Sequence, residues 1–250
     1  MSPSQEAKVA VYWLEHSRAQ RIVWLLEELK LSYELHIFKR QKNMQADPKL
    51  KEIHALGKSP VVIVEKEGAP QPLVLAESGF IVEYLIENFG DSATIQSYEP
   101  SKSDQQESES WRKQRYFMHY VEGSFMPFLH IEAVVSNIRN APVPFFIKPV
   151  TKMISDRVHQ GYLDHNLQTH LRFLETEIGE NQYLCGDKLS GPDFLILYPL
   201  QVLDVTGLLN KKDYPNLMDY LLRLQNRDAY QRAVAKIETA GASVGPLPRM

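Results

Sequence analysis

The sequence is poor in cysteine, in excess positive charge and in long apolar runs, and each shortage excludes a class of protein. Cys185 is its single cysteine, which excludes an internal disulfide framework and a four-cysteine zinc site and is typical of a reducing compartment. The net charge is -3, so the chain lacks the basic field that holds nucleic acid phosphates. We therefore expect a cytoplasmic protein that binds neither nucleic acid nor metal.

No apolar stretch reaches the roughly 18 residues that cross a bilayer. The longest, residues 192–203, is interrupted by Asp193, Pro199 and Gln201. The opening MSPSQEAKVAVYWL carries an acidic residue and only a short apolar run, unlike an export signal. The sequence thus predicts no membrane span, and its 44% hydrophobic and 24% charged residues are typical of a globular protein with one large or two modest cores.

The first ninety or so residues alternate between strand and helix patterns. The apolar run from Val9 to Leu14 predicts a strand. Apolar side chains at helical spacing predict a helix over residues 18–30, with Ser17 capping its start and Glu27 and Glu28 facing solvent. The following patterns predict a strand over 33–38, a short helix ending near 54, a hairpin of strands starting at 61 and 73, and a helix over 77–85.

The pattern changes after residue 92. Segment 93–106 is rich in Ser, Gln, Asp and Glu, and we interpret it as a linker. A proline-rich stretch with Phe145 and Phe146 predicts an ordered loop or an aromatic lid. We predict an α/β domain over residues 1–92 and an all-α domain over residues 107–250. The periodic stretches beyond the linker are all helical and cover residues 111–138, 150–178, 191–205 and 214–238.

Four phrases occur in the order of a known family: WLEHSRAQRIVWLLEEL, HALGKSPVV, LAESGFIVEYL and YLCGDKLSGPDFLI. With the element order, they resemble the glutathione transferase family over essentially the whole chain, and fungal, yeast-type members most closely. The resemblance implies a thioredoxin-like N-terminal domain that binds glutathione, an all-helical C-terminal domain and a homodimer. It also identifies Ser190 and Asp193 as a reciprocal helix cap.

The pair Glu77-Ser78 begins a predicted helix, where free backbone N–H groups, the positive end of the helix dipole and a hydroxyl favour an anion. A plain helix cap would use the same residues. The resemblance implies that the γ-glutamyl carboxylate of glutathione binds at Ser78 and that Glu77 faces its ammonium group.

Ser59-Pro60 is a candidate cis peptide, although a proline can simply start an edge strand. The resemblance implies that the Ser59 backbone pairs with the cysteinyl part of glutathione and that Lys58 meets its glycyl carboxylate; a solvated surface lysine is the alternative. Where some relatives place a glutathione-binding histidine, this sequence offers Lys39, Arg40 or Lys42, and the choice stays open.

Catalysis requires the glutathione thiol to ionise, because the thiolate is the nucleophile. A pKa shift of two units needs about 2.7 kcal/mol, and a hydroxyl that donates to a charged group supplies about 1.5 to 3 kcal/mol. Ser17, four residues before Arg21, has the spacing of serine-type family members, and Tyr12 is the competing catalytic hydroxyl. Cys185 is interpreted as a packed thiol and not as a nucleophile.

A hydrophobic cosubstrate is expected between the domains. Tyr116, His119, Tyr120 and Gly123 follow a helical spacing that places them on one face, although aromatic stripes more often belong to a core. The resemblance implies a glutathione S-transferase that conjugates small hydrophobic electrophiles for detoxification. The alternatives are a glutathione-dependent peroxidase that uses the same thiolate and a non-catalytic, glutathione-binding regulatory protein.

Overall fold

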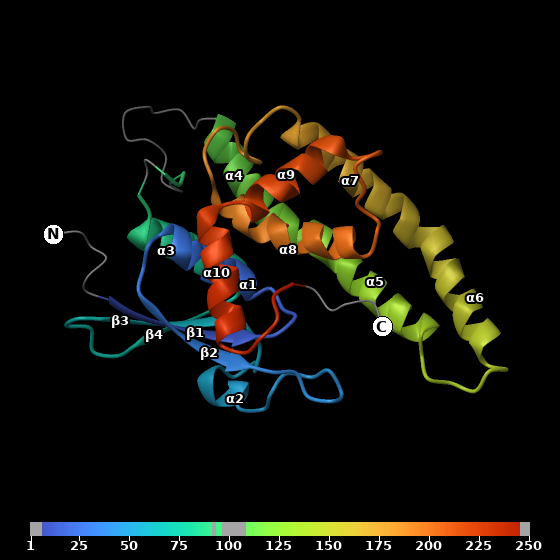
Figure 1. Cartoon of the computed structure of the whole chain (residues 1–250), viewed down its shortest axis with the longest axis horizontal. Helices are drawn as coiled ribbons and strands as arrows, with labels where there is room; N and C mark the ends of the chain where they lie inside the picture. Colours follow the sequence, from blue (N-terminus) through green and yellow to red (C-terminus); the bar gives the residue numbers. More distant parts are fainter. Residues whose placement is uncertain (1–6, 92–93, 97–108, 246–250) are drawn as a thin grey trace.

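The N-terminal part of the chain, called the sheet half below, folds around a four-stranded sheet with the strand order β2-β1-β3-β4. The computed structural model (Figure 1) describes residues 7–91, 94–96 and 109–245. β1 is parallel to β2 and antiparallel to β3, which is antiparallel to β4. The predicted β-α-β-α-β-β-α order and thioredoxin-like fold are confirmed. The elements are β1 (Ala7–Leu14), α1 (Gln20–Glu28), β2 (Tyr33–Phe38), α2 (Leu50–Ile53), β3 (Val61–Lys66), β4 (Leu73–Ala76) and α3 (Ser78–Phe89).

Side-chain alternation along β1 explains how the sheet is oriented. Val9, Val11 and Trp13 are buried in one core with the apolar side chains of α1 and α3. Tyr12 points to the opposite face, where its ring stacks on His36 of β2 at a centroid distance of 4.7 Å. One face of the central strand therefore supports the helices, and the other is only partly covered.

The described part of the C-terminal half is helical, as predicted. Three of the predicted helices are nevertheless divided. Residues 111–138 and 150–178 each contain a π-helical turn, η2 and η3, and the stretch 214–238 breaks at Arg227, whose backbone is extended. The elements are α4 (Glu109–Tyr120), η2 (Val121–Phe125), α5 (Met126–Arg139), α6 (Lys148–Val158), η3 (His159–Leu163), α7 (Asp164–Ile178), α8 (Gly191–Val205), α9 (Pro215–Gln225) and α10 (Asp228–Thr239).

A buried carboxylate fixes the start of α8. Asp193 is inaccessible to solvent and accepts hydrogen bonds from the backbone N–H of Ser190 at 2.7 Å, the Ser190 hydroxyl at 2.6 Å and the Leu184 N–H at 2.9 Å. The Tyr220 hydroxyl is a fourth donor. The predicted capping box is confirmed, and these bonds compensate the burial of the carboxylate.

Helix α1 lies between the sheet and the helical half (Figure 1). Its Trp24 ring packs on Phe194 of α8 at a centroid distance of 4.4 Å. Glu28 forms an ion pair with Arg227, and Glu27 forms one with Arg232 of α10. The expectation that both glutamates face solvent is wrong. The sequence pattern identifies the apolar face of α1, but it does not show that α10 packs against the polar face.

Most of the predicted linker, residues 93–106, lies outside the described residues, so the domain boundary stays a prediction. Ile95, within the described part, forms a parallel bridge with Leu189 just before α8. Among the described residues, we find no helix with the length and apolar character to cross a membrane.

Candidate functional site

Ser78 is the first residue of α3 and is only 5% exposed. Glu77 precedes it with a φ of 69°, a left-handed conformation that is costly for a residue with a side chain. The Glu77 carbonyl accepts the hydrogen bond from Ile81 N at 2.9 Å, which begins the helix, while its side chain is exposed. The predicted helix start at this pair is thus confirmed.

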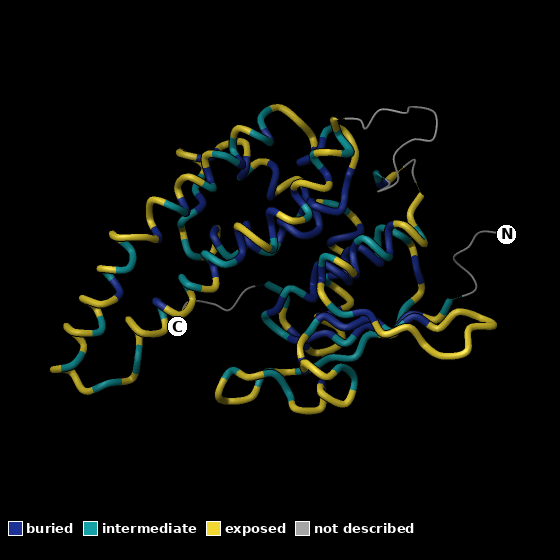
Figure 2. The backbone as a smooth tube through the Cα atoms, turned by 180° about the vertical axis from the view of Figure 1, so that it is seen from behind, coloured by how far each residue is buried: buried dark blue, intermediate teal, exposed yellow. Residues whose placement is uncertain are grey.

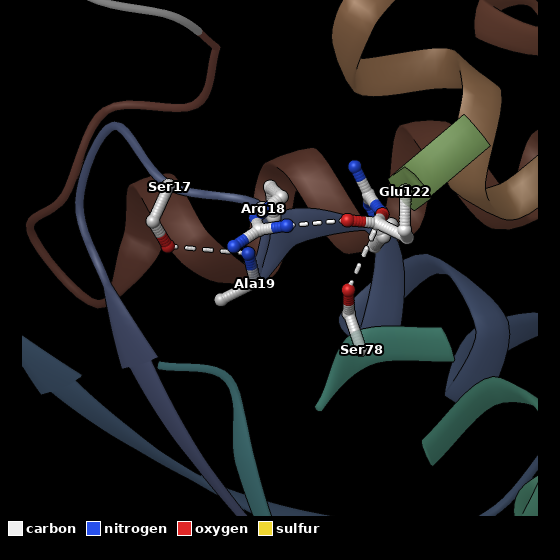
Figure 3. A network of polar contacts seen from close by, with 6 residues as sticks. Ser17, Arg18, Ala19, Ser78 and Glu122 are labelled. Atoms are coloured by element: carbon white, nitrogen blue, oxygen red, sulfur yellow. Dashed lines mark hydrogen bonds and ion pairs between the residues drawn. The ribbon is translucent and has the colours of Figure 1, made fainter. Parts of the chain in front are cut away.

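A buried arginine of α1 lies beside Ser78. Arg21 has no exposed surface, and its Nη1 is bonded to Glu122 Oε1 and lies 3.4 Å from Ser78 Oγ. Arg18 contacts the other oxygen of Glu122, as Figure 3 shows. Among the described residues, Arg21 Nε and Nη2 have no hydrogen-bond partner. Such buried donors are costly unless an acceptor meets them, and the Tyr198 ring lies 5.9 Å from the guanidinium carbon.

Glu122 lies in η2, between α4 and α5, and links the helical half to α1. Burial raises the pKa of this carboxyl, but the guanidinium groups of Arg21 and Arg18 outweigh that effect and hold its pKa below the usual range. Burial also lowers the pKa of Arg21, yet arginine stays protonated at neutral pH. The cluster therefore contains two cations and one anion beside the positive end of α3, and its net charge is positive.

The predicted cis peptide at Ser59-Pro60 is present. The Ser59 hydroxyl donates to the carbonyl of Tyr12 at 2.9 Å and accepts from Leu14 N at 3.1 Å. Its side chain is therefore held by β1, and its backbone is the part left for recognition. Lys58 is exposed. The glutathione-binding roles of Lys58 and Ser59 stay predictions.

Ser17 lies in the turn between β1 and α1 and is 8% exposed. Its hydroxyl donates to the Leu14 carbonyl at 2.7 Å and accepts from Ala19 N at 3.1 Å; Figure 3 shows the bond to Ala19. Because α1 begins only at Gln20, with Ala19 in the N-cap position, the prediction that Ser17 caps this helix is wrong. The hydroxyl must leave the Leu14 carbonyl before it can donate to a thiolate.

Arg40 contacts the same turn. Its Nη2 donates to the His16 carbonyl at 3.1 Å and its Nη1 to the Met44 carbonyl at 2.9 Å. Lys39 and Lys42 are exposed. Of the three basic residues that the sequence left open, Arg40 is therefore the one that holds the turn containing Ser17. Tyr12, the competing hydroxyl, is half-buried in its stack with His36.

The three predicted cosubstrate residues differ in their surroundings. Tyr120 is buried, stacks on Phe125 and shares a hydrogen bond of 2.7 Å with His170 Nδ1. Burial raises the pKa of Tyr120 above its ordinary value. Tyr116 is 53% exposed and His119 is exposed. Tyr120 thus belongs to an aromatic core, and the cosubstrate role of the three residues stays a prediction.

Cys185 is buried in the helical half, 3% exposed. Burial, with a contribution from nearby Asp193, raises the pKa of its thiol to about 12. Since a nucleophilic cysteine needs a low pKa and access, the interpretation as a packed thiol is confirmed.

Comparison with known proteins identifies the family. Residues 9–87 match the model of the glutathione S-transferase N-terminal domain, and residues 156–228 match that of the C-terminal domain. The chain is 35% identical to glutathione S-transferase 1 of Saccharomyces cerevisiae over 236 residues, which cover 94% of this chain and 97% of the yeast protein. The chain belongs to the glutathione transferase family. The similarity to a yeast member supports the predicted fungal type.

Solved structures of glutathione transferases share the fold. A glutathione S-transferase from Actinobacillus pleuropneumoniae is 25% identical with a TM-score of 0.65, over 94% of both chains. A glutathione transferase homologue from Lodderomyces elongisporus, solved with two glutathione molecules per subunit, has a TM-score of 0.67 at 19% identity over 90% of this chain and 97% of that one. The second likeness concerns the fold alone.

Sequence reasoning missed three residues of the candidate site. Arg18, Arg21 and Glu122 form the cluster beside Ser78, but the sequence prediction used Arg21 only as a spacing marker. One signal was available: Arg21 stands in the apolar stripe of α1 next to Ile22, three residues before Trp24. A cation at a core position needs a buried acidic partner, and that rule predicts a carboxylate without naming Glu122.

Proposed function

We propose that this chain binds glutathione between α1 and α3, ionises its thiol and adds the sulfur to small hydrophobic electrophiles. The observation that carries the proposal is the Ser78 hydroxyl at the positive end of α3, held beside the net positive cluster of Arg18, Arg21 and Glu122. Membership of the glutathione transferase family supports it. The division into domains at residues 92 and 107 and a cytoplasmic location are part of the same proposal.

The γ-glutamyl end of glutathione carries a carboxylate and an ammonium group, and the cluster offers a partner for each. The carboxylate would accept from the Ser78 hydroxyl and from the free N–H groups of α3. Glu122 Oε1 lies 3.5 Å from Ser78 Oγ, so the ammonium group can meet this carboxylate, with exposed Glu77 on the outer side. Lys58 would meet the glycyl carboxylate, and the Ser59 backbone would pair with the cysteinyl residue.

The sulfur then extends toward the turn between β1 and α1. Ser17 supplies a hydroxyl there, and its rotation from the Leu14 carbonyl toward sulfur exchanges a bond to a neutral acceptor for one to a charged acceptor, which is the stronger. The Ser17 hydroxyl accepts a hydrogen bond from the backbone N–H of Ala19 in the same turn. Hydrogen bonding to the thiolate lowers the pKa of the thiol.

Ser78→Ala is expected to weaken glutathione binding by about 10- to 150-fold, because a hydrogen bond to a charged group contributes about 1.5 to 3 kcal/mol. The turnover number at saturating glutathione should change little, since Ser78 is assigned to the γ-glutamyl carboxylate and not to the sulfur. Isothermal titration with glutathione measures the affinity. Ser136→Ala, which removes a half-buried hydroxyl of α5, is the matched control, and equal affinities for the two variants would contradict the assigned role.

The reaction itself is tested with a chlorinated nitrobenzene, whose conjugation is followed by absorbance. Turnover above the uncatalysed rate supports transferase chemistry. Reduction of an organic hydroperoxide, followed with a coupled glutathione reductase, would reveal the peroxidase alternative. Tight binding of glutathione without turnover of several electrophiles would instead favour the regulatory protein.

Exposed apolar side chains on three neighbouring elements, β4, α3 and α4, support the proposed homodimer. Leu73, Val74, Phe80 and Tyr116 are each 41 to 53% exposed; α3 contacts β4, and an Arg115–Glu83 contact of 3.8 Å joins α4 to α3. Patches of this kind are typical of protein interfaces.

Phe80→Asp is expected to convert the dimer into a monomer, because it places a charge in an apolar interface core. Light scattering measures the mass. Leu222→Asp, an exposed apolar position on α9, is the control that should stay dimeric. A wild-type mass of one chain would reject the dimer.

A further inference from the structure

The α5–α6 hairpin extends away from the body of the molecule (Figure 1), and much of its tip is exposed (Figure 2). Phe145 and Phe146, in the connecting loop, are 82% and 66% exposed. Val150, Met153 and Ile154 on α6 and Val134 and Ile138 on α5 are exposed as well. Isolated exposed apolar residues are ordinary, but a concentration at one tip marks an interaction surface.

The same tip is positively charged, although the whole chain is negative. Between Glu132 and Asp156 the sequence contains no acidic residue, and it contains Arg139, Lys148 and Lys152. These three side chains line a pocket of about 450 Å³ at the loop. Arg139 is paired with Asp156 at 2.7 Å, and both lysines are exposed. The aromatic pair is thus bordered by cations.

We propose that this hairpin tip docks on an anionic phospholipid surface. Phe145 and Phe146 would enter the boundary between headgroups and acyl chains, and Lys148 and Lys152 would meet the lipid phosphates. Exposed aromatic residues beside basic ones are typical of peripheral attachment, in which apolar burial and attraction to anionic lipid act together. The inference is independent of the proposed function, since it uses no residue of the glutathione site.

Charge and distance make two other occupants poor fits. A two-fold contact between the tips of two copies would bring the same patch together from both sides, so it would gather two sets of Lys148 and Lys152 with no acidic residue between Glu132 and Asp156 to offset them. To act as a lid over the glutathione site, Phe145 would have to reach Glu122. Glu122 lies just before the start of α5, whereas Phe145 lies beyond its end. The 14 residues of α5 span about 21 Å, and the tip lies at the far end.

Vesicle flotation of the full chain tests the proposal. We expect the wild type to partition onto vesicles of phosphatidylcholine with phosphatidylserine at least about tenfold better than onto phosphatidylcholine alone, and to dissociate at high salt. Phe145→Ser with Phe146→Ser should lower binding to both kinds of vesicle, and Lys148→Glu with Lys152→Glu should abolish the preference for phosphatidylserine. Leu222→Ser with Lys212→Glu, away from the hairpin, is the control and should bind as the wild type does.

Absence of binding, or equal binding to neutral and anionic vesicles, would overturn the proposal. Without vesicles, a change in the mass of the hairpin variants would indicate self-association, and an altered KM for the electrophile would indicate a lid. Either result, if flotation of the variants is unchanged, would reject the proposal that the tip docks on a membrane surface. Retained glutathione affinity shows that a variant is folded. If a variant does not fold, the dependence of wild-type flotation on phosphatidylserine and salt still decides.

Discussion

Replacing Ser17 with alanine is expected to lower kcat/KM for glutathione conjugation by about 10- to 150-fold, which corresponds to the loss of a hydrogen bond of about 1.5 to 3 kcal/mol to the thiolate. The thiol of bound glutathione should ionise at a higher pH, so the alkaline rise of the pH–rate profile should move upward. Ultraviolet absorbance of the thiolate in the binary complex measures that pKa directly.

Ser17 also holds its own turn, through Leu14 and Ala19, so activity alone does not separate chemistry from local structure. Ser17→Thr keeps the hydroxyl and should restore most of the rate. Tyr12→Phe is the matched test of the competing hydroxyl and should leave the thiol pKa unchanged. A raised thiol pKa in Tyr12→Phe with a normal one in Ser17→Ala would reverse the assignment.

Replacing Glu122 with glutamine is expected to lower the free energy of unfolding by about 2 to 4 kcal/mol, because it leaves the cation of buried Arg21 without a counter-charge. The Glu122 side chain is only 23% exposed, so solvent screens the pair weakly. Urea denaturation at neutral pH measures the effect. Asp219→Asn is the matched control, since the Asp219–Lys211 pair is more exposed and should contribute less than about 1 kcal/mol.

The effect of Glu122→Gln should also depend on pH. Because the folded pKa of Glu122 lies below its unfolded value of about 4.3, the stabilisation by Glu122 is complete above that value and is lost as the pH falls through the folded pKa. The difference between wild type and variant should therefore narrow on acidification from pH 6 to pH 3. A difference that stays constant would show that charge is not what Glu122 contributes.

The features that sequence predicted well depend on local chemistry. The strand β1 follows from its β-branched alternation, the start of α8 from the spacing of Ser190 and Asp193, and the cis bond was a candidate because proline follows Ser59. Each of these is determined by residues close together in the chain. The order of strands and helices followed in the same way, and the family resemblance supplied how they assemble.

The features that sequence missed depend on contacts between distant residues. Glu122 and Arg21 meet across the two halves of the chain, and nothing near either one names the other. The π turn η2 adds a residue to the helical turn. The helical spacing that places Tyr116 and Tyr120 on one face therefore does not extend beyond Tyr120. Ser17 was placed in a helix cap because its preference for such positions is strong, but the turn is two residues longer than predicted and Ala19 takes the N-cap position.

The position of α1 between the two halves has a consequence for the modularity of the protein. Trp24 is covered by Phe194, and Arg21 is neutralised by Glu122, so the sheet half expressed alone would expose an indole and leave a cation without its counter-charge. A chimera that joins this sheet half to the helices of a relative would inherit the same defect unless the partner residues were transplanted with it. The halves are separable in sequence but must evolve together.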